Sequence, residues 1–444
     1  MEHTDSIRER ASPGARSVRN WYCAFWLTLV LGVTAMLAIG GQPDPPGLGR
    51  PLDGTWRFHP GDDSAWSDPG ADDRSWDQIT LVSQPEVRDS DVGLPGYLDG
   101  WRAHGHPGLD GYGWYRKQVT LPQRDDLVLV GPPAVDDGYE MFWDGHPIGG
   151  IGRLSGSPRV NTTRPMLATL PPARGGQTAM LAIRTFMQPG LDRDAHSGGL
   201  RTVPVLAPKA DGEALYRAEW RRTIAGYIVD AAEPAAMLVL ALLAIFAAPM
   251  QARPGFARWV ALALLASAGL RLGNAISAWT DLVSLPTLLW QNKVILAPLA
   301  KLAWTIAWNH WTDGRGPRLI SPNSLNSLNS LIAVAAWTAM VAGALAHTEL
   351  LAEVGRALFA LSLAAIAFRI ARRGEHKWLA LPAMLLIAAG LFAADLSTLG
   401  VPGIWFPFDI GVSRSQYAYA LALPLLACAL AAARGNISRG HNTD

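Results

Sequence analysis

Two groups of side chains in this sequence have residue types and spacing that could do chemistry. The first lies in the aromatic, histidine-containing stretch 101–115, where large rings could stack on a small ligand and their polar tips could hydrogen-bond to it. The second lies inside otherwise apolar segments, where polar groups are costly and are therefore candidates for function. The first group is Trp101, His104, His106, Tyr112 and Trp114; the second is Asp230, Glu233, Arg271, Asn274, Lys293, Lys301 and Asp395.

Neither group predicts a metal site or a catalytic centre. His104 and His106 have no third ligand nearby, whereas zinc sites use three or four protein ligands. Asp136 and Asp137 are adjacent and would point to opposite faces of a strand, so they could not flank one glycosidic bond as two catalytic carboxylates do. We interpret them as hairpin-shaping residues. Because the sequence also has no phosphate-binding loop, we predict no catalytic residue, no cofactor and no enzymatic activity.

The elements that must position these groups begin with apolar segments of membrane-spanning length. A bilayer core of about 30 Å needs about 20 mostly apolar residues per helix. One such segment, 21–41, precedes a polar region, and the module 223–434 after it contains seven more. Their expected ranges are 223–249, 257–279, 287–310, 330–347, 350–370, 378–399 and 414–434.

The distribution of Lys and Arg predicts the orientation of these segments. Basic residues precede the segment 21–41 and occupy alternate connections, whereas the connections around 280–286 and 400–413 contain none. Basic loops stay in the cytoplasm. We therefore expect a multi-pass protein of the bacterial inner membrane, with a cytoplasmic N-terminus at 1–20, a signal anchor at 21–41, an exported domain at 42–222 and a cytoplasmic tail at 435–444. Alternatively, 21–41 is a cleaved signal peptide, since Ala38-Ile39-Gly40 offers small residues at a suitable spacing.

The exported region 42–222 is predicted to be an all-β sandwich or jelly roll. Short apolar runs alternate with Gly, Pro and Asp, and Asp144-Gly145 is a hairpin turn signal between "YEMFW" and "HPIGG". The region contains no cysteine, because Cys23 and Cys428 both fall in apolar segments, so a packed core must stabilise it. We expect Trp56, Trp76, Trp114 and Trp143 in that core, while Trp101 could serve either core or ligand.

Ordered motifs extend this prediction to a family. "LDGTWRFHPGDDSAW", "DPGADDRSWDQI", "GYGWYRKQVTLP" and "VDDGYEMFWDGHPIGG" follow one another between residues 52 and 150. Together they resemble the sugar-binding jelly-roll domain of β-galactosidase-like glycoside hydrolases, with Asp144-Gly145 where many relatives have Asn-Gly. The resemblance implies a galactose-binding-like fold and a carbohydrate ligand. The catalytic barrel that accompanies this domain in those enzymes has no counterpart here.

The combination of this domain with seven apolar segments resembles bacterial seven-transmembrane receptors of the diverse intracellular signalling module type. That resemblance implies a sensor that binds an extracytoplasmic ligand and relays the signal through its helices. Such receptors usually continue into a cytoplasmic output domain, whereas here ten residues follow Arg434. We therefore expect a separate cytoplasmic signalling effector as partner, besides the lipid bilayer. A net charge of +1 gives no indication of nucleic-acid binding.

The polar side chains inside the apolar segments leave two further hypotheses open. Asp230 or Glu233 could pair with Arg271, and Asp395 with Lys293 or Lys301, either to fix helix packing or to line a transport pathway. A membrane transporter or membrane-embedded enzyme with an accessory β domain is therefore one alternative to the sensor. The other is a membrane scaffold that binds a protein through the aromatic loop around Trp101.

Overall fold

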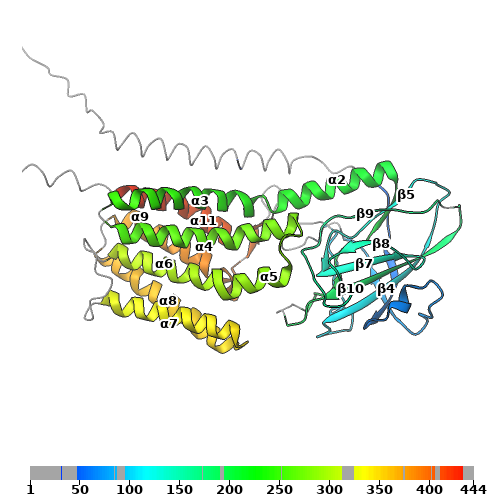
Figure 1. Ribbon diagram of the computed structural model, residues 1–444, viewed down its shortest axis with the longest axis horizontal. Coiled ribbons are helices and arrows are strands. Elements are labelled where there is room, and N and C mark those ends of the chain that lie inside the picture. Colours follow the sequence, from blue (N-terminus) through cyan, green and yellow to red (C-terminus); the bar gives the residue numbers. More distant parts are fainter. Residues whose placement is uncertain are drawn as a thin grey trace, which may run out of the picture.

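The computed structural model describes residue 32 and residues 48–433, except for 85, 88–95, 173, 191–194, 252, 313–324, 374–375, 402 and 406–410. The predicted N-terminus (1–20), the signal anchor (21–41, apart from Gly32) with Cys23, and the tail (435–444) lie outside the described residues. Figure 1 shows a β-rich domain at one end and a bundle of long helices at the other, with α2 running along the β domain toward α3.

Two antiparallel sheets form the β domain. The smaller sheet has the order β1 (Arg50–Pro51), β12 (Val205–Pro208), β5 (Leu127–Val130) and β9 (Leu167–Thr169). The larger has the order β3 (Asp77–Leu81), β2 (Gly54–Pro60), β4 (Gly111–Thr120), β10 (Thr178–Met187), β7 (Gly138–Trp143) and β8 (His146–Ile151). A short pair, β6 (Val135–Asp136) with β11 (Gly199–Leu200), lies at one end of β10.

A single apolar core lies between the two sheets. Phe58 and Tyr115 enter it from the larger sheet, and Leu129 and Leu206 enter it from the smaller one. Burial of large apolar side chains on facing sheets is the main driving force for such a sandwich. Of the four tryptophans predicted in this core, Trp56 and Trp143 lie in it. Trp76 and Trp114 are also buried, but they belong to a separate cluster outside the inter-sheet core.

The predicted hairpin is also confirmed. Strands β7 and β8 are joined by Asp144 and Gly145 alone, with Trp143 opposite His146. Both turn residues have positive φ, 46° and 81°, which is the conformation that a two-residue type I′ turn requires. Asp136 and Asp137, in contrast, are not at a hairpin tip. They lie in β6 and just before β7, where their carboxylates accept hydrogen bonds from the backbone N–H groups of Gly198 and Gln188.

Helix α2 (Lys209–Gly226) corrects the all-β prediction for residues 42–222. It begins directly after β12 and packs across β5, β12 and β9. A Cβ atom built on Gly212 would lie 2.2 Å from Cγ2 of Val128, so only glycine permits this close approach of helix and strand. The sequence "KADGEALYRAEWRR" shows no apolar stripe with helical spacing, so hydrophobic periodicity does not predict this helix. The face that contacts the sheet consists largely of small residues instead of large apolar ones.

In the described part of the bundle, helices follow one another up to its last connection. Its helices are α3 (Val229–Ala247), α4 (Pro254–Trp279), α5 (Leu285–Trp290), a π-helical turn (Gln291–Leu296), α6 (Ala297–Thr312), α7 (Leu325–Leu345), α8 (Glu349–Arg373), α9 (Lys377–Leu391), α10 (Ala393–Ser397) and α11 (Arg414–Ala432). The last connection, before α11, contains the short strand pair β13 (Ile404–Trp405) and β14 (Val412–Ser413).

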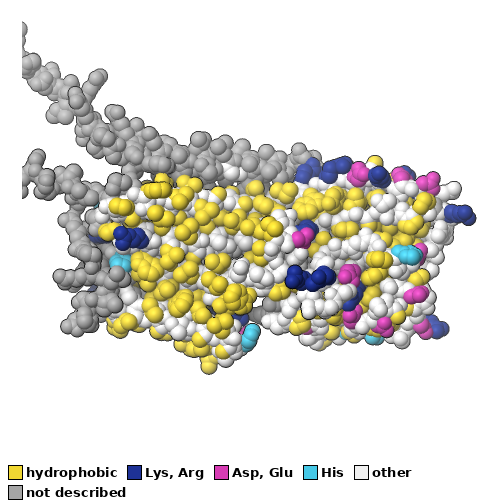
Figure 2. Space-filling model, in the orientation of Figure 1, with side chains coloured by type: hydrophobic (Ala, Val, Ile, Leu, Met, Phe, Trp, Pro, Cys, Tyr) yellow, Lys and Arg dark blue, Asp and Glu magenta, His cyan; other side chains and the backbone are white. Residues whose placement is uncertain are grey.

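Five helical stretches among the described residues are long and apolar enough to cross a membrane. Apolar side chains cover much of the bundle in Figure 2, whereas acidic and basic side chains are frequent on the β domain. The predicted segments 287–310 and 378–399 overlap α5 to α6 and α9 to α10, whose individual helices are shorter. The five stretches are Lys209–Ala247, Pro254–Trp279, Ser327–Leu345, Glu349–Arg372 and Arg414–Ala432.

Arg116, in the "GYGWYR" motif, gives the first testable prediction. This guanidinium is 1% exposed, donates to the carbonyls of Trp66 and Asp68, and lies 3.0 Å from the Asp73 carboxylate. Replacing it with Met leaves buried acceptors and a carboxylate without their donor, so Arg116→Met should lower the free energy of unfolding of the β domain by about 3–5 kcal/mol.

The measurement is denaturant unfolding of the full chain followed by tryptophan fluorescence. Arg74→Met is the matched control, because Arg74 also pairs with an aspartate, Asp72, but both side chains are exposed. Its effect should stay within about 0.5 kcal/mol. Equal effects of the two substitutions would contradict the anchoring role of Arg116.

Candidate functional site

The aromatic residues predicted to form a ligand lip lie on two different faces of the larger sheet. Trp101 is fully buried in the core between the sheets, where its ring packs against Phe58 and its Nε1 donates to the Leu109 carbonyl. Tyr112 and Trp114 lie on the opposite face of β4, in other clusters. Trp114 is also fully buried. Neither tryptophan therefore has a ring face open to a ligand.

The two histidines of the same stretch do not join these rings in one site. His104 is exposed in a turn, whereas the His106 ring packs on Phe58 and its Nε2 lies 3.3 Å from the Asp77 carboxylate. Tyr112 donates its hydroxyl to the Leu154 carbonyl and lies under the Arg184 guanidinium. Among the described residues, no group of three or more His, Cys, Asp or Glu side chains could hold a metal ion.

An open cleft of about 760 Å³ lies on the outer face of the larger sheet, beside Trp114 and Phe142. The charged side chain at its centre is Arg184. It forms a bidentate ion pair with Asp62, with both hydrogen bonds at 2.7 Å, and a second ion pair with Glu140 at 3.0 Å. Both carboxylates thus accept from one guanidinium. The arrangement is that of a structural ion-pair cluster, which ties the loop before the 3₁₀ turn Ser64–Ser67 to β7 and β10.

Four of the polar side chains predicted inside the apolar segments do converge. Asp230 and Glu233 of α3 meet Arg271 and Asn274 of α4: the Arg271 Nε lies 3.7 Å from Glu233, and the Asn274 amide donates to Asp230 over 3.3 Å. The predicted pairing of Arg271 with one of the two acids is therefore confirmed.

A third helix completes this cluster. Gln416 of α11, absent from the predicted set, donates to the second carboxylate oxygen of Asp230 over 2.9 Å, and Arg271 donates to the Ser413 hydroxyl over 3.3 Å. The cluster therefore joins α3, α4 and α11 through side chains that all lie near one end of the bundle.

The remaining predicted polar residues lie elsewhere. Lys301 is buried in α6 with its amine 5.3 Å from the ring centre of Phe392, and Lys293 lies in the π-helical turn. The ion partner of Asp395 is Arg356 of α8, at 3.6 Å, and not either lysine as proposed from the sequence. Asp395 also lies in α10, after the break that ends α9 at Leu391. These three residues do not line the site described next.

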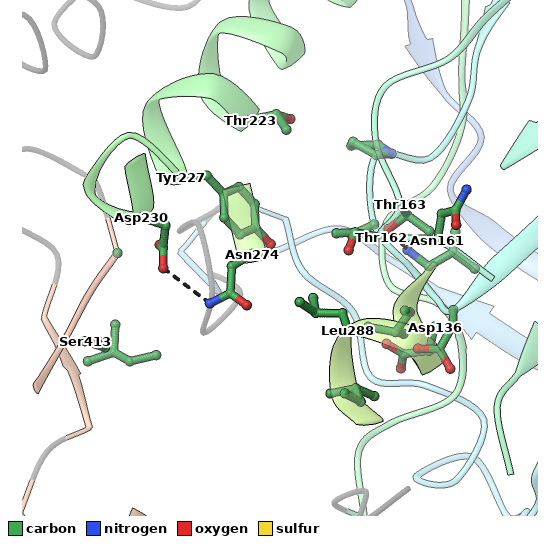
Figure 3. A pocket seen from close by; sticks show the side chains of 18 of the residues that line it. Asp136, Asn161, Thr162, Thr163, Thr223, Tyr227, Asp230, Asn274, Leu288 and Ser413 are labelled. Atoms are coloured by element: carbon green, nitrogen blue, oxygen red, sulfur yellow. Dashed lines mark hydrogen bonds between the residues drawn. The ribbon is translucent and has the colours of Figure 1, made fainter. Parts of the chain in front are cut away.

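A cavity of about 370 Å³ lies between the β domain and the helical bundle. Figure 3 shows Tyr227, Asp230 and Asn274 on one side of it and Asn161, Thr162, Thr163 and Asp136 on the other. Its lining combines hydroxyls, amides, carboxylates and a few leucines. The cavity therefore has hydrogen-bond donors and acceptors together with an apolar surface. The bundle side contains three of the predicted polar residues, Asp230, Arg271 and Asn274.

Direct hydrogen bonds hold the two walls of the cavity together. The Asn161 amide donates to the Asp281 carboxylate over 2.6 Å, the hydroxyls of Thr162 and Ser277 are 2.8 Å apart, and the backbone N–H of Leu285 donates to the Val160 carbonyl. Arg164 also pairs with Asp281. The hydrogen bond from Arg164 is the main cause that holds the pKa of the Asp281 carboxyl below its usual range, and burial opposes it. The charge of Arg164 and the hydrogen bond from Asn161 lower the pKa further.

The β-domain wall of this cavity was missed by sequence reasoning. Its residues are Tyr97 and two separate segments, 133–137 and 161–163, which have no common periodicity. The one available signal was "NTTR" at 161–164, a run of polar side chains two residues before β9. Short polar runs are also typical of ordinary loops, so this signal alone does not identify a site.

The fold is a two-sheet β domain docked on an apolar helical bundle, and five helical stretches among the described residues are long and apolar enough to cross a membrane. No protein-family model matches the chain, and no curated protein matches it. Among solved structures, a Bacteroides uniformis β-glucuronidase is 18% identical over 35% of this chain and 17% of that chain, with a TM-score of 0.26. A Faecalibacterium prausnitzii β-glucuronidase is 16% identical over 38% of this chain and 33% of that one, with a TM-score of 0.25.

A Bacteroides vulgatus β-glycosidase is similar at the same level, with 19% identity over 36% of this chain and 20% of that chain, and a TM-score of 0.24. This chain spans at most a third of the length of these three enzymes. Likenesses at these scores carry no argument about activity.

The lowered pKa of Asp281 leads to a prediction about acid sensitivity. A carboxyl with a depressed folded-state pKa stabilises the contact fully above its unfolded pKa, and this stabilisation is lost as the pH falls through the folded-state value. The docking of the β domain should therefore be constant from pH 8 to pH 5 and loosen only below about pH 4.

Spin labels on exposed positions of the two parts, Gln118→Cys on β4 and Leu350→Cys on α8, report this docking as a distance distribution. With Asp281→Asn the distribution should already be broad at neutral pH and should change little on acidification. Asp72→Asn is the control, because Arg74 lowers the pKa of Asp72 in the same way but far along the chain from the junction. Identical acid responses of the wild type and Asp281→Asn would refute the assignment.

Proposed function

We propose that this protein is an integral membrane sensor whose ligand binds in the cavity between the β domain and the helical bundle. The ligand is a sugar-sized polyhydroxylated molecule. The bundle contributes seven membrane-spanning helices and relays ligand binding to a separate cytoplasmic signalling protein. The β domain is a galactose-binding-like jelly roll held outside the bacterial inner membrane, with both chain termini in the cytoplasm.

The observation that carries this proposal is the composition of the cavity wall. Residues of the β domain (Asn161, Thr162) and of the apolar helices (Asp230, Asn274) line the same space. The affinity of a ligand that contacts both walls depends on how the β domain is positioned relative to the bundle. This dependence is the physical requirement for coupling binding to a conformational change. A site confined to the outer cleft of the β domain would lack this property.

The chemistry of the lining favours a polyhydroxylated ligand. Hydroxyl groups of Thr162, Thr163 and Ser413 and amide groups of Asn274 and Gln416 can each donate and accept, which suits a ligand rich in hydroxyls. Leu285 and Leu288 supply an apolar surface for the carbon skeleton of such a molecule. The volume lies within the range of small-molecule sites.

The arrangement of the connections supports the proposed orientation. Two connections of the bundle without Lys or Arg lie at the end that faces the β domain. The connection 280–284 hydrogen-bonds to the β domain through Asp281, and the connection between α10 and α11 lines the junction cavity through Gly411. The turn after α3, which carries Arg253, lies at the opposite end of the bundle, where Gln251 donates to the Leu430 carbonyl near the end of α11. Basic residues at the far end are those expected on the cytoplasmic side.

Transport is the second candidate function, and one observation favours it. Asp230 and Arg271, two of the residues expected around a water-accessible pathway, line the junction cavity. Glu233 and Lys301 do not line it: Glu233 is buried against Arg271, and Lys301 lies under Phe392.

The scaffold hypothesis loses its main support, because Trp101 is buried and offers no aromatic loop to a partner.

Binding is tested with the full chain in lipid nanodiscs against a panel of monosaccharides, disaccharides and amino acids. A ligand of the cavity should raise the thermal midpoint in a saturable manner, since binding to the folded state alone stabilises it. Thr162→Trp, which fills part of the cavity, should abolish the shift, whereas Ser155→Trp in the outer cleft should leave it unchanged.

Two outcomes would count against the sensor. If no member of the panel shifts the midpoint at millimolar concentration, the carbohydrate assignment fails. If Ser155→Trp abolishes the shift and Thr162→Trp does not, the ligand binds in the outer cleft and the junction is not the site.

A further inference from the structure

The helix that connects the β domain to the bundle is interrupted beside the junction cavity. Helix α2 ends at Gly226 and α3 begins at Val229. Across the break the Tyr227 N–H still bonds to the Thr223 carbonyl, four residues back, whereas the Ile228 N–H bonds to the Ala225 carbonyl, three residues back. The α-helical hydrogen-bond pattern therefore tightens for one turn and then restarts.

The sequence explains why the break lies at this position. Glycine is about 1 kcal/mol less favourable than alanine inside a helix, and Gly226 is the last residue of α2. Pro234 has no N–H, so it leaves the carbonyl of Asp230, four residues earlier, without its helical donor, and its ring crowds that carbonyl. Two helix-weakening residues thus flank residues 227–230.

The two sides of the break are attached to different parts of the protein. On one side, α2 is fixed to the smaller sheet by its packing across β5 and by the Lys209 N–H, which donates to the Asp126 carbonyl over 2.7 Å. On the other side, α3 belongs to the core of the bundle, and its Asp230 is bonded to α4 and α11. Bending at the break therefore changes the angle between the β domain and the bundle, which also touch through the hydrogen bonds of Asn161, Thr162 and Val160.

The cavity touches both sides of the break and the break itself. Thr223 lies in α2, Tyr227 within the break and Asp230 in the first turn of α3, and all three line the cavity (Figure 3). We propose that residues Gly226–Ile228 are a hinge, and that occupancy of the junction cavity changes the direction of α3 relative to α2. This inference rests on the proposed function only in taking the cavity as the ligand site.

Hydrogen bonds connect the first turn of α3 to the start of α11. The Gln416 side chain that donates to Asp230 also accepts from the Ser413 N–H over 2.6 Å, and Ser413 caps the N-terminus of α11 in a capping box. Ser413 in addition accepts a hydrogen bond from Arg271 of α4. A displacement of Asp230 therefore acts on the start of α11, the last helix among the described residues.

A hinge on one edge of the molecule should open or close the opposite edge. In Figure 1, α2 and α3 run along one side, whereas α7 and α8 lie on the other. The labels at Gln118→Cys and Leu350→Cys, in a background with Cys23→Ser and Cys428→Ser, report the distance between the β domain and α8. Electron paramagnetic resonance on the full chain in nanodiscs measures it without any ligand.

Thr162→Trp stands in for an occupied cavity, and we expect it to shift the mean label distance by several ångströms. Thr162→Val is the matched control: it removes the same hydroxyl contact to Ser277 without filling the space, and it should leave the distance near that of the wild type. Leu288→Trp fills the cavity from the other wall and should reproduce the shift if Thr162→Trp does not fold.

Pro234→Ala tests the hinge itself. It supplies an N–H to the Asp230 carbonyl and stiffens the first turns of α3, which lie directly after the hinge, so the tryptophan-induced shift should fall to less than half in this background. An undiminished shift with Pro234→Ala, or no shift with either tryptophan, would overturn the hinge. If the shift occurs but no sugar binds, the sensing proposal fails and the hinge stands.

Discussion

The hydrogen bonds to the Asp230 carboxylate are the interaction on which the arrangement of this protein depends. A carboxylate among apolar helices is costly unless its oxygens are satisfied. Asn274 of α4 satisfies one oxygen and Gln416 of α11 the other, so the neighbouring helices α3 and α4 must meet the sequence-distant α11 at this point. Their meeting forms one wall of the cavity, and the docked β domain forms the other.

Local sequence patterns were sufficient to predict a two-sheet β domain, the hairpin at Asp144-Gly145 and the presence of several long apolar helices. In each case one local rule, such as a two-residue alternation or about 20 apolar residues in a row, decides the structure. Helix α2 does not obey such a rule. It has charged residues along most of its length and is helical because small residues such as Gly212 allow it to lie closely on β5.

The candidate site was predictable only on its bundle side. A charged residue in an apolar segment is conspicuous, and Asp230, Arg271 and Asn274 were identified for that reason. Their partners Gln416 and Ser413 lie at a helix start, where polar residues are ordinary caps, so nothing marked them. For Trp101 the loop sequence left a core role and a ligand role both open. The structure places its ring in the inter-sheet core, because loop residues can fold back over a sheet end.

The pairing of β1 with β12 has a consequence for the order of events during synthesis. These strands come from the two ends of the β domain, with Arg50 opposite Leu206, and α2 starts at the residue after β12. The smaller sheet cannot close until nearly the whole domain has left the ribosome. The finished domain then holds its entry and exit strands side by side, so the chain approaches and leaves it at one point, and α2 leads directly from that point to the bundle.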